Sequence, residues 1–290
     1  MIRVGLAGWG DHDSLYKPGT AAKAKLPRYG DHFSLVEMDS SFYAVQPPDR
    51  MARYAEETPD NFRFVVKAYQ GMTGHLRGKP YYTNDDDMYT AVRDSLEPMM
   101  HAGKLWAALF QYPPWFDCSK QNVTLLRETK RRMEGFPCAL EFRHQSWYTL
   151  EFRERTMAFM REEGWIHSVC DEPQAGIGSI PIVLEASRPD YTLVRFHGRN
   201  VGGWNQSGEA NWREVRYLYN YNDAELEEWA GRIRQLLTSS AEVGIVFNNN
   251  SGGHAAGNAK SFMRLLGLPV PEFPEAAIPE APEQLDLFSL

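Results

Sequence analysis

Carboxylate, imidazole and guanidinium side chains stand at the ends of several short apolar runs of this 290-residue chain. Glu37 ends one run, Glu141 and Arg143 end a second, and Arg195 and His197 end a third. Side chains two residues apart on a strand share a face, so each pair would point the same way. Carboxylates beside imidazole and guanidinium groups can move protons and stabilise developing charge. The spacing therefore predicts acid–base chemistry.

The candidate site divides by role. The predicted catalytic residues are Glu37, Glu141, Asp171 and His197. The predicted ligand-binding residues are Trp9, Tyr43, Lys67, His75, Gln111, Arg143, His144, Arg195, Asn248 and Asn249. Among these are three cations, Lys67, Arg143 and Arg195. If the ends of their strands meet at one end of the fold, the three positive charges lie together, which predicts a phosphate-bearing ligand. The aromatic rings would stack on a base or sugar, and the amides would bind hydroxyls or phosphate oxygens.

Each of these groups also has a structural interpretation. Glu141 and Arg143 could form only an ion pair at the rim of a fold, since polar networks also hold proteins together. Lys67 could be a solvated residue at a strand end. The two asparagines could be turn residues, and the aromatic residues could belong to the core.

A divalent metal is left open as a cofactor. Oxygen and imidazole donors occur at Glu37, Asp39, Glu141, His144, Asp171 and His197, and at His75 in a loop. Their spacing matches no dedicated metal motif, and neighbouring cations disfavour a metal unless a phosphate lies between them. The chain has no Gly-x-Ser-x-Gly sequence, so serine-hydrolase chemistry is not expected.

The elements that must position these side chains follow from the hydrophobic pattern. Eight apolar or β-branched runs predict strands: Ile2–Ala7, Leu35–Asp39, Phe62–Ala68, Leu105–Gln111, Cys138–Phe142, Trp165–Cys170, Tyr191–Phe196 and Val243–Asn248. Helical spacing occurs over Pro47–Glu57, Lys120–Met133, Tyr148–Glu163, Ala224–Leu237 and Gly257–Leu266. The alternation predicts an α/β fold, a single-domain TIM-type (β/α)₈ barrel over residues 1–267, with polar strand ends at one mouth.

An open, doubly wound sheet is the alternative fold. It is disfavoured because Ala7-Gly8-Trp9-Gly10-Asp11 lacks the Gly-x-Gly-x-x-Gly sequence of dinucleotide-binding folds. Two long loops, Gln70–Asp87 and Gly198–Tyr221, are expected to carry function. The second holds aromatic residues that would stack on an exposed base, namely Trp204, Trp212, Tyr217, Tyr219 and Tyr221.

These segments resemble the YecE-like family, also called domain of unknown function 72. The matching segments are Gly8-Trp9, Val36 to Tyr43, Phe62 to Lys67, Gln111 to Pro114, Glu141 to Trp147, Val194 to Gly198 and Phe247 to Asn249. Together they cover residues 1 to about 266, and their order makes the match specific. The resemblance implies a TIM-type barrel and implies no reaction. This chain departs from the family pattern at Asp39, where asparagine is common, and over Gly10–Asp13.

The last segment, residues 268–290, is predicted to be a flexible acidic tail rich in proline. Near its end, Gln284-Leu285-Asp286-Leu287-Phe288 resembles the peptide with which bacterial polymerases and repair proteins bind the DNA sliding clamp. Gln284 would bind at the rim of a groove, Leu285, Leu287 and Phe288 would fill apolar pockets, and Asp286 would face solvent. Docking of this segment on its own domain is the structural alternative.

Composition limits the function classes. The net charge is −7, of which residues 271–290 contribute −5, so the body carries −2 and lacks the basic surface of an avid DNA binder. No run of 18 apolar residues exists, so no membrane span is expected. The three cysteines, Cys118, Cys138 and Cys170, form no Cys-x-x-Cys pair, which favours a cytoplasmic protein without disulfides.

Three functions remain open. The first is a hydrolase or lyase acting on a phosphate-bearing substrate related to nucleic acid, such as a phosphodiester or nucleoside, and recruited to DNA for repair by the clamp. The second is a barrel enzyme for small sugars or sugar phosphates. The third is a clamp-bound module without catalytic activity.

Overall fold

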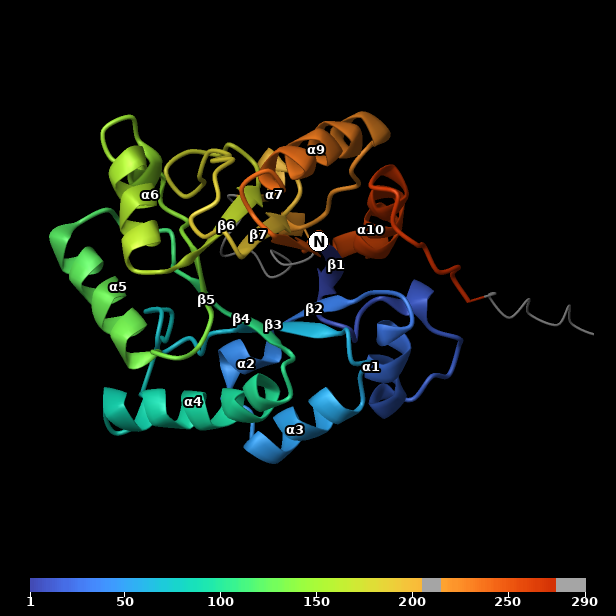
Figure 1. Cartoon of the computed structure of the whole chain (residues 1–290), viewed down its shortest axis with the longest axis horizontal. Coiled ribbons are helices and arrows are strands. Elements are labelled where there is room, and N and C mark those ends of the chain that lie inside the picture. Colours follow the sequence, from blue (N-terminus) through green and yellow to red (C-terminus); the bar gives the residue numbers. More distant parts are fainter. Residues whose placement is uncertain (205–214, 275–290) are drawn as a thin grey trace, which may run out of the picture.

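The computed structural model describes residues 1–204 and 215–274 and contains a closed barrel of eight parallel strands in sequence order (Figure 1). The strands are β1 Ile2–Ala7, β2 Leu35–Met38, β3 Arg63–Lys67, β4 Leu105–Gln111, β5 Cys138–Glu141, β6 Ile166–Asp171, β7 Tyr191–Phe196 and β8 Glu242–Phe247. β8 pairs with β1 and closes the barrel. The predicted single-domain TIM-type barrel is therefore confirmed.

Helices surround the strands in Figure 1. The α-helices are α1 Ala22–Gly30, α2 Ser40–Tyr43, α3 Pro48–Glu56, α4 Asp85–His101, α5 Lys120–Arg132, α6 Arg153–Glu162, α7 Val201–Trp204, α9 Asp223–Leu236 and α10 His254–Leu265. Short 3₁₀ helices in the described residues are η1 Asp13–Leu15, η2 Gln145–Tyr148 and η3 Ser251–Gly253. Within the described residues, the connection from β6 to β7 contains no helix.

Several helices differ from the sequence prediction: α1, α2, α4 and α7 are not among the expected helices, and α6 and α10 begin at other residues. α4 begins at Asp85, inside the segment predicted as a loop, because the Asn84 side chain accepts the Asp87 N–H and three aspartates favour a helix N-terminus. α6 begins at Arg153 rather than Tyr148, because Trp147 and Tyr148 are buried in η2 before it.

The barrel interior is filled by small and branched side chains from all eight strands. This inner layer comprises Ala7, Leu35, Val65, Ala107, Leu109, Ala139, Ile166, Leu193 and Val246. Below it, the Arg3 guanidinium binds Glu242 at 2.6 Å, and the Trp106 indole donates to the same carboxylate at 2.8 Å. A larger apolar cluster lies between strands and helices. These layers leave the carboxyl ends of the strands for the site.

Residues after α10 lie against the barrel before the described chain ends. Leu268 and Val270 pack against the core, the Lys260 ammonium donates to the Pro271 carbonyl at 2.7 Å, and it lies 3.6 Å from the centre of the Phe273 ring. Part of the predicted tail is thus attached to the domain. The peptide Gln284–Phe288 lies outside the described residues. Within residues 1–204 and 215–274, no helix has the length and apolar content to cross a bilayer.

Candidate active site

Arg195 on β7 is the centre of a buried ion-pair cluster at the carboxyl ends of the strands. Its Nε and Nη2 donate to the two Glu37 oxygens of β2 at 2.8 and 2.5 Å. Its Nη1 donates to both Glu141 oxygens of β5 at 2.8 and 2.7 Å. All three side chains are fully buried. The closed barrel brings together residues 158 positions apart in the sequence.

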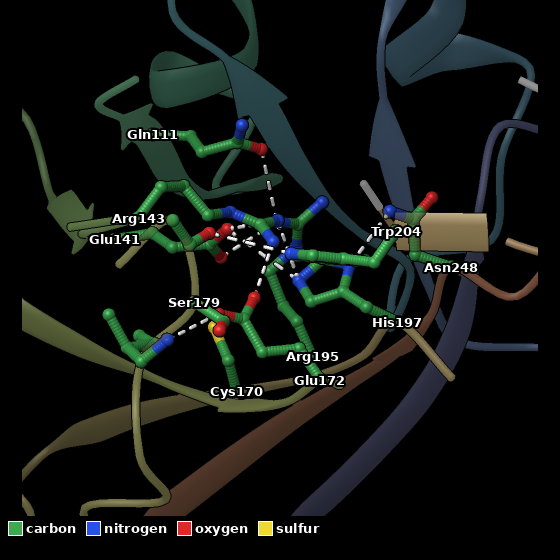
Figure 2. Close-up of polar contacts among 12 residues, drawn as sticks. Gln111, Glu141, Arg143, Cys170, Glu172, Ser179, Arg195, His197, Trp204 and Asn248 are labelled. Carbon is green, nitrogen blue, oxygen red and sulfur yellow. Dashed lines mark hydrogen bonds and ion pairs between the residues drawn. The ribbon is translucent and has the colours of Figure 1, made fainter. Parts of the chain in front are cut away.

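Arg143 extends the cluster to a third carboxylate (Figure 2). Its Nη2 lies 2.7 Å from Glu141 Oε1, and its Nη1 donates to Glu172 Oε2 at 2.5 Å. Glu172 also accepts the Ile180 N–H at 2.7 Å, and the Ser168 hydroxyl donates to Glu141 at 3.0 Å. Three carboxylates and two guanidinium groups thus form one continuous network.

His197 lies beside both arginines as a neutral imidazole. Burial lowers its pKa well below the usual value, and the charges of Arg143 and Arg195 add to the effect. Its Nε2 lies 2.9 Å from Arg143 Nη2, and its Nδ1 lies 3.0 Å from the Asn248 amide nitrogen. A guanidinium only donates, so Nε2 must accept and Nδ1 carries the proton. This tautomer is satisfied when the Asn248 side-chain amide presents its oxygen to Nδ1.

The carboxyls of Glu141 and Glu172 differ in their affinity for a proton. Burial opposes the ionisation of Glu141, but Arg195 and Arg143 outweigh it and hold its pKa well below the usual value. Burial raises the pKa of Glu172 to about 7, against the attraction of Arg143 and the Ile180 N–H. Neighbouring carboxyls with separated pKa values are the arrangement that divides acid and base roles in enzymes.

The three predicted cations each have a carboxylate partner. Arg195 and Arg143 bind the buried glutamates, and the Lys67 ammonium lies 3.3 Å from Asp39 Oδ1. Lys67 also lies 5.0 Å above the Phe42 ring at the edge of the mouth. The cluster is therefore close to neutral, and the excess positive charge inferred from the sequence is not present in it.

Aromatic residues of the β7–α9 connection cover the cluster. The Arg143 guanidinium lies 5.2 Å from the Trp204 ring centre, and Arg216 lies 4.2 Å from the same ring. The Tyr217 ring lies 6.3 Å from His197 and from Trp204. Trp204 is only 3% exposed, and Glu141 and Glu172 are buried as well, so this part of the cluster is closed off from solvent. Trp212 of the same predicted stacking set lies outside the described residues.

Other predicted ligand-binding residues lie near the mouth. The Gln111 oxygen is 3.4 Å from Arg195. His75 binds Thr73 at 2.8 Å and packs against Phe42, and burial with the Lys67 charge lowers its pKa to about 4. Tyr43 is 57% exposed on the outer rim. These positions surround the cluster without joining its ion pairs.

Four further predicted residues have partners elsewhere and do not join the cluster. Asp171 binds Arg199 at 3.0 Å instead, and Trp9 packs edge-on against Tyr54 of α3 at 5.2 Å. His144 accepts the Ser146 N–H at the start of η2. Asn249 donates to the Tyr219 carbonyl and to Asn258. Each of these side chains holds local structure.

Sequence reasoning missed Glu172, Ser168 and Cys170. On β6 the even positions point into the barrel, so Ser168 and Cys170 meet Glu141 and Glu172 follows them, while Asp171 points to the helical layer. Every residue of β6 is buried, so burial does not distinguish its two faces. The sequence signal that could have found these residues is their position at every second residue, Ser168, Cys170 and Glu172, which places them on one face of the strand.

The donor set does not fit a divalent metal. Donor atoms of Glu141, Cys170 and His197 lie within 4.8 Å of one another. However, both Glu141 oxygens already accept from Arg195, and burial raises the pKa of the Cys170 thiol well above its usual value. A metal would have to displace a guanidinium and deprotonate a buried thiol.

The fold and site define a TIM-type barrel protein with a buried carboxylate–guanidinium cluster at the carboxyl ends of its strands. The family profile described as "Protein of unknown function DUF72" matches residues 3–284, and the chain belongs to this family. It is 53% identical over 289 residues to the UPF0759 protein YunF of Bacillus subtilis (strain 168), an alignment that covers 99% of this chain and 100% of YunF.

Two crystal structures of DUF72 family proteins have the same fold. The protein from Enterococcus faecalis V583 is 36% identical, with a TM-score of 0.87 over 95% of this chain and 98% of that chain. The protein from Thermotoga maritima MSB8 is 28% identical, with a TM-score of 0.78 over 92% and 99% of the two chains.

Proposed function

We propose that this chain is an acid–base enzyme for small polyhydroxylated substrates, namely sugars or sugar phosphates. The observation that carries the proposal is the meeting of Glu37, Glu141 and Glu172 with two arginines and a neutral histidine at the carboxyl ends of the strands. This end is where TIM-type barrels place their catalytic groups.

Glu172 is the proposed proton donor and acceptor. Its carboxyl exchanges a proton near neutral pH, which is the condition for efficient general acid–base catalysis. Glu141 stays ionised between Arg143 and Arg195 and fixes both guanidinium groups. His197 contributes a neutral imidazole beside them. Trp204 lies over Arg143, the arginine that binds Glu172, so this ring is part of the proposed site.

The charge balance favours this function over cleavage of a phosphodiester. Both buried arginines are occupied by carboxylates, so a phosphate inside the cluster would compete with Glu37, Glu141 and Glu172. A phosphate on the substrate would instead meet cations at the rim. Lys67 lies there, and Arg77 lies 5.1 Å from the exposed Trp115 ring. A phosphate group on such a sugar would therefore stay at the rim, outside the buried cluster.

The test is a substrate panel of free sugars, sugar phosphates and glycosides, incubated in deuterated water and followed by NMR for isotope exchange and for product. We expect turnover by the native chain and a loss of about 10²–10⁴-fold in Glu172→Gln. The control is Glu185→Gln, which removes an exposed carboxylate that binds only Arg161 among the described ion pairs. Full activity in Glu172→Gln, or no exchange with the whole panel, would contradict the proposal.

A second proposal concerns recruitment. We propose that Gln284–Phe288 binds the bacterial sliding clamp and would bring the enzyme to DNA under repair; the support is the residue pattern alone. Calorimetry with the peptide 280–290 should give micromolar affinity, as expected for a short peptide with a few apolar anchors. The same peptide carrying Leu287→Ala and Phe288→Ala is the control. An absence of binding heat, without displacement of a known clamp ligand, counts against recruitment.

A further inference from the structure

Tyrosine side chains surround a hollow on the rim of the barrel, outside the buried cluster. The hollow measures about 530 Å³ and lies between the α2–α3 connection, the β3–α4 loop and α4. Its polar lining residues are Tyr43, Gln46, Tyr69, Tyr81, Tyr82 and Asp94. A volume of this size is typical of small-molecule sites, which occupy roughly 300–1,000 Å³.

The tyrosine rings form a connected wall. The Tyr82 ring lies 5.7 Å from Tyr69 and 5.0 Å from Tyr81, at interplanar angles of 85° and 80°. Tyr69 is buried and anchors the wall, whereas Tyr81 is 83% exposed and Tyr43 is 57% exposed. Large aromatic surfaces held at the edge of a hollow are suited to stacking on a ring-shaped ligand.

The charges around the hollow select the ligand. Asp94 is the one charged residue among the described residues that line it, and no lysine or arginine does so. The nearby Arg50 donates to the Gln46 side chain at 2.9 Å. A carboxylate without a lining cation repels phosphates, which disfavours a nucleic acid strand. It accepts hydrogen bonds from hydroxyl groups, as do the tyrosine oxygens.

We propose that this hollow binds a neutral carbohydrate, with one sugar face on the tyrosine rings and hydroxyls donated to Asp94. The hollow lies beside the mouth, because Tyr43 follows Phe42, whose ring is 5.0 Å from the Lys67 ammonium and 5.2 Å from His75. A neutral carbohydrate in this hollow would be the substrate of the acid–base enzyme proposed above, so its role as a substrate rests on that proposed function. A sugar chain held in the hollow would extend toward the buried carboxylates.

Binding can be tested without turnover. We would titrate the full chain with cellotetraose and with maltotetraose, and use tetragalacturonate as a matched anionic sugar, with calorimetry or NMR chemical shifts as the readout. We expect binding of at least one neutral sugar and weaker binding of tetragalacturonate. Tyr81→Ala and Tyr43→Ala should each weaken binding about 5-fold or more, since each removes one stacking face.

Two controls separate this site from the rest of the chain. Phe273→Ala removes a partly exposed ring beside Lys260 and should leave binding unchanged. Glu172→Gln should also bind normally, so that a failed catalytic proposal and a failed binding proposal give different results. The inference is overturned if neither neutral sugar binds, if Tyr81→Ala binds as the native chain does, or if oligodeoxythymidylate or decaproline binds more tightly than the sugars.

Discussion

At the scale of single residues, Glu141 holds the cluster together. Its two oxygens accept hydrogen bonds from Arg195 and Ser168, one of them lies 2.7 Å from Arg143 Nη2, and none of this network is open to solvent. A buried ion pair contributes little net stability compared with apolar residues, but removing one partner leaves an uncompensated charge. The network therefore fixes the geometry of the site more than it stabilises the fold.

Replacing the Glu141 carboxylate should destabilise the folded chain. In Glu141→Gln two buried guanidinium groups would share two carboxylates, and we expect a loss of roughly 3–5 kcal/mol in the free energy of unfolding. Urea denaturation followed by circular dichroism measures it. The control Glu185→Gln breaks an exposed ion pair with Arg161 and should cost less than about 1 kcal/mol. Equal stability of the two variants would show that the buried network contributes little.

The raised pKa of the buried Glu172 carboxyl should make the stability of the chain depend on pH. Burial raises this pKa from 4.5 to about 7, so between these values the folded chain keeps a proton that the unfolded chain has lost. Unfolding then releases a proton, and the free energy of unfolding falls as pH rises from about 5 to 7, by on the order of 1–3 kcal/mol. Glu172→Gln should lack this fall. The difference between the two curves isolates Glu172, because the buried histidines are common to both.

A parallel curve for Glu172→Gln and the native chain over this range would place the Glu172 pKa at its usual value. The glutamate would then be an ionised partner of Arg143 at neutral pH and not the proton donor proposed above.

At the scale of elements, the barrel interior depends on a fit between β4 and β8. A Cβ on Gly244 of β8 would lie 2.9 Å from the Trp106 ring of β4, closer than such atoms approach. Trp106 is held in place by its bond to Glu242, so it cannot easily move away. Gly244 thus makes room for the indole that fills the lower end of the barrel.

We expect Gly244→Ala to lose about 1–3 kcal/mol in the free energy of unfolding, the usual cost of overpacking. The matched control is Gly231→Ala in α9, where an added Cβ meets no atom within 4 Å. That substitution should stabilise the chain by about 0.5–1 kcal/mol, because alanine favours a helix interior. Thermal denaturation of both variants checks the pair, and a neutral Gly244→Ala would show that the ring can shift.

At the scale of the whole molecule, the segment after α10 belongs to the domain as far as it is described. Lys260 is buried, and burial lowers its pKa to about 8 although it donates to the Pro271 carbonyl. The folded domain therefore continues past α10, the last helix of the barrel, and includes residues that follow it.

Two shortened chains test this attachment. A chain ending at residue 267 should be less stable than one ending at residue 274 by about 1–3 kcal/mol, since it loses the burial of Leu268 and Val270 and leaves Lys260 without the Pro271 carbonyl. Comparison of their urea midpoints measures the difference. Equal midpoints would mean that residues 268–274 add no stability and act only as a linker.

Local pattern was enough to predict much of this protein. The alternation of apolar runs and helical segments determined a barrel, and the period of two along a strand correctly paired Glu141 with Arg143 and Arg195 with His197. Both features are properties of neighbouring residues, so they can be read without knowing the fold.

Only the tertiary structure decided which groups meet. Closure of the barrel places Glu37 of β2 against Arg195 of β7, and the register of β6 turns Glu172 inward and Asp171 outward. Strands buried on both faces carry no clear polar side from which to predict that choice. The same closure neutralised the cations that the sequence left unpaired, because ion pairing depends on distances in space and not along the chain.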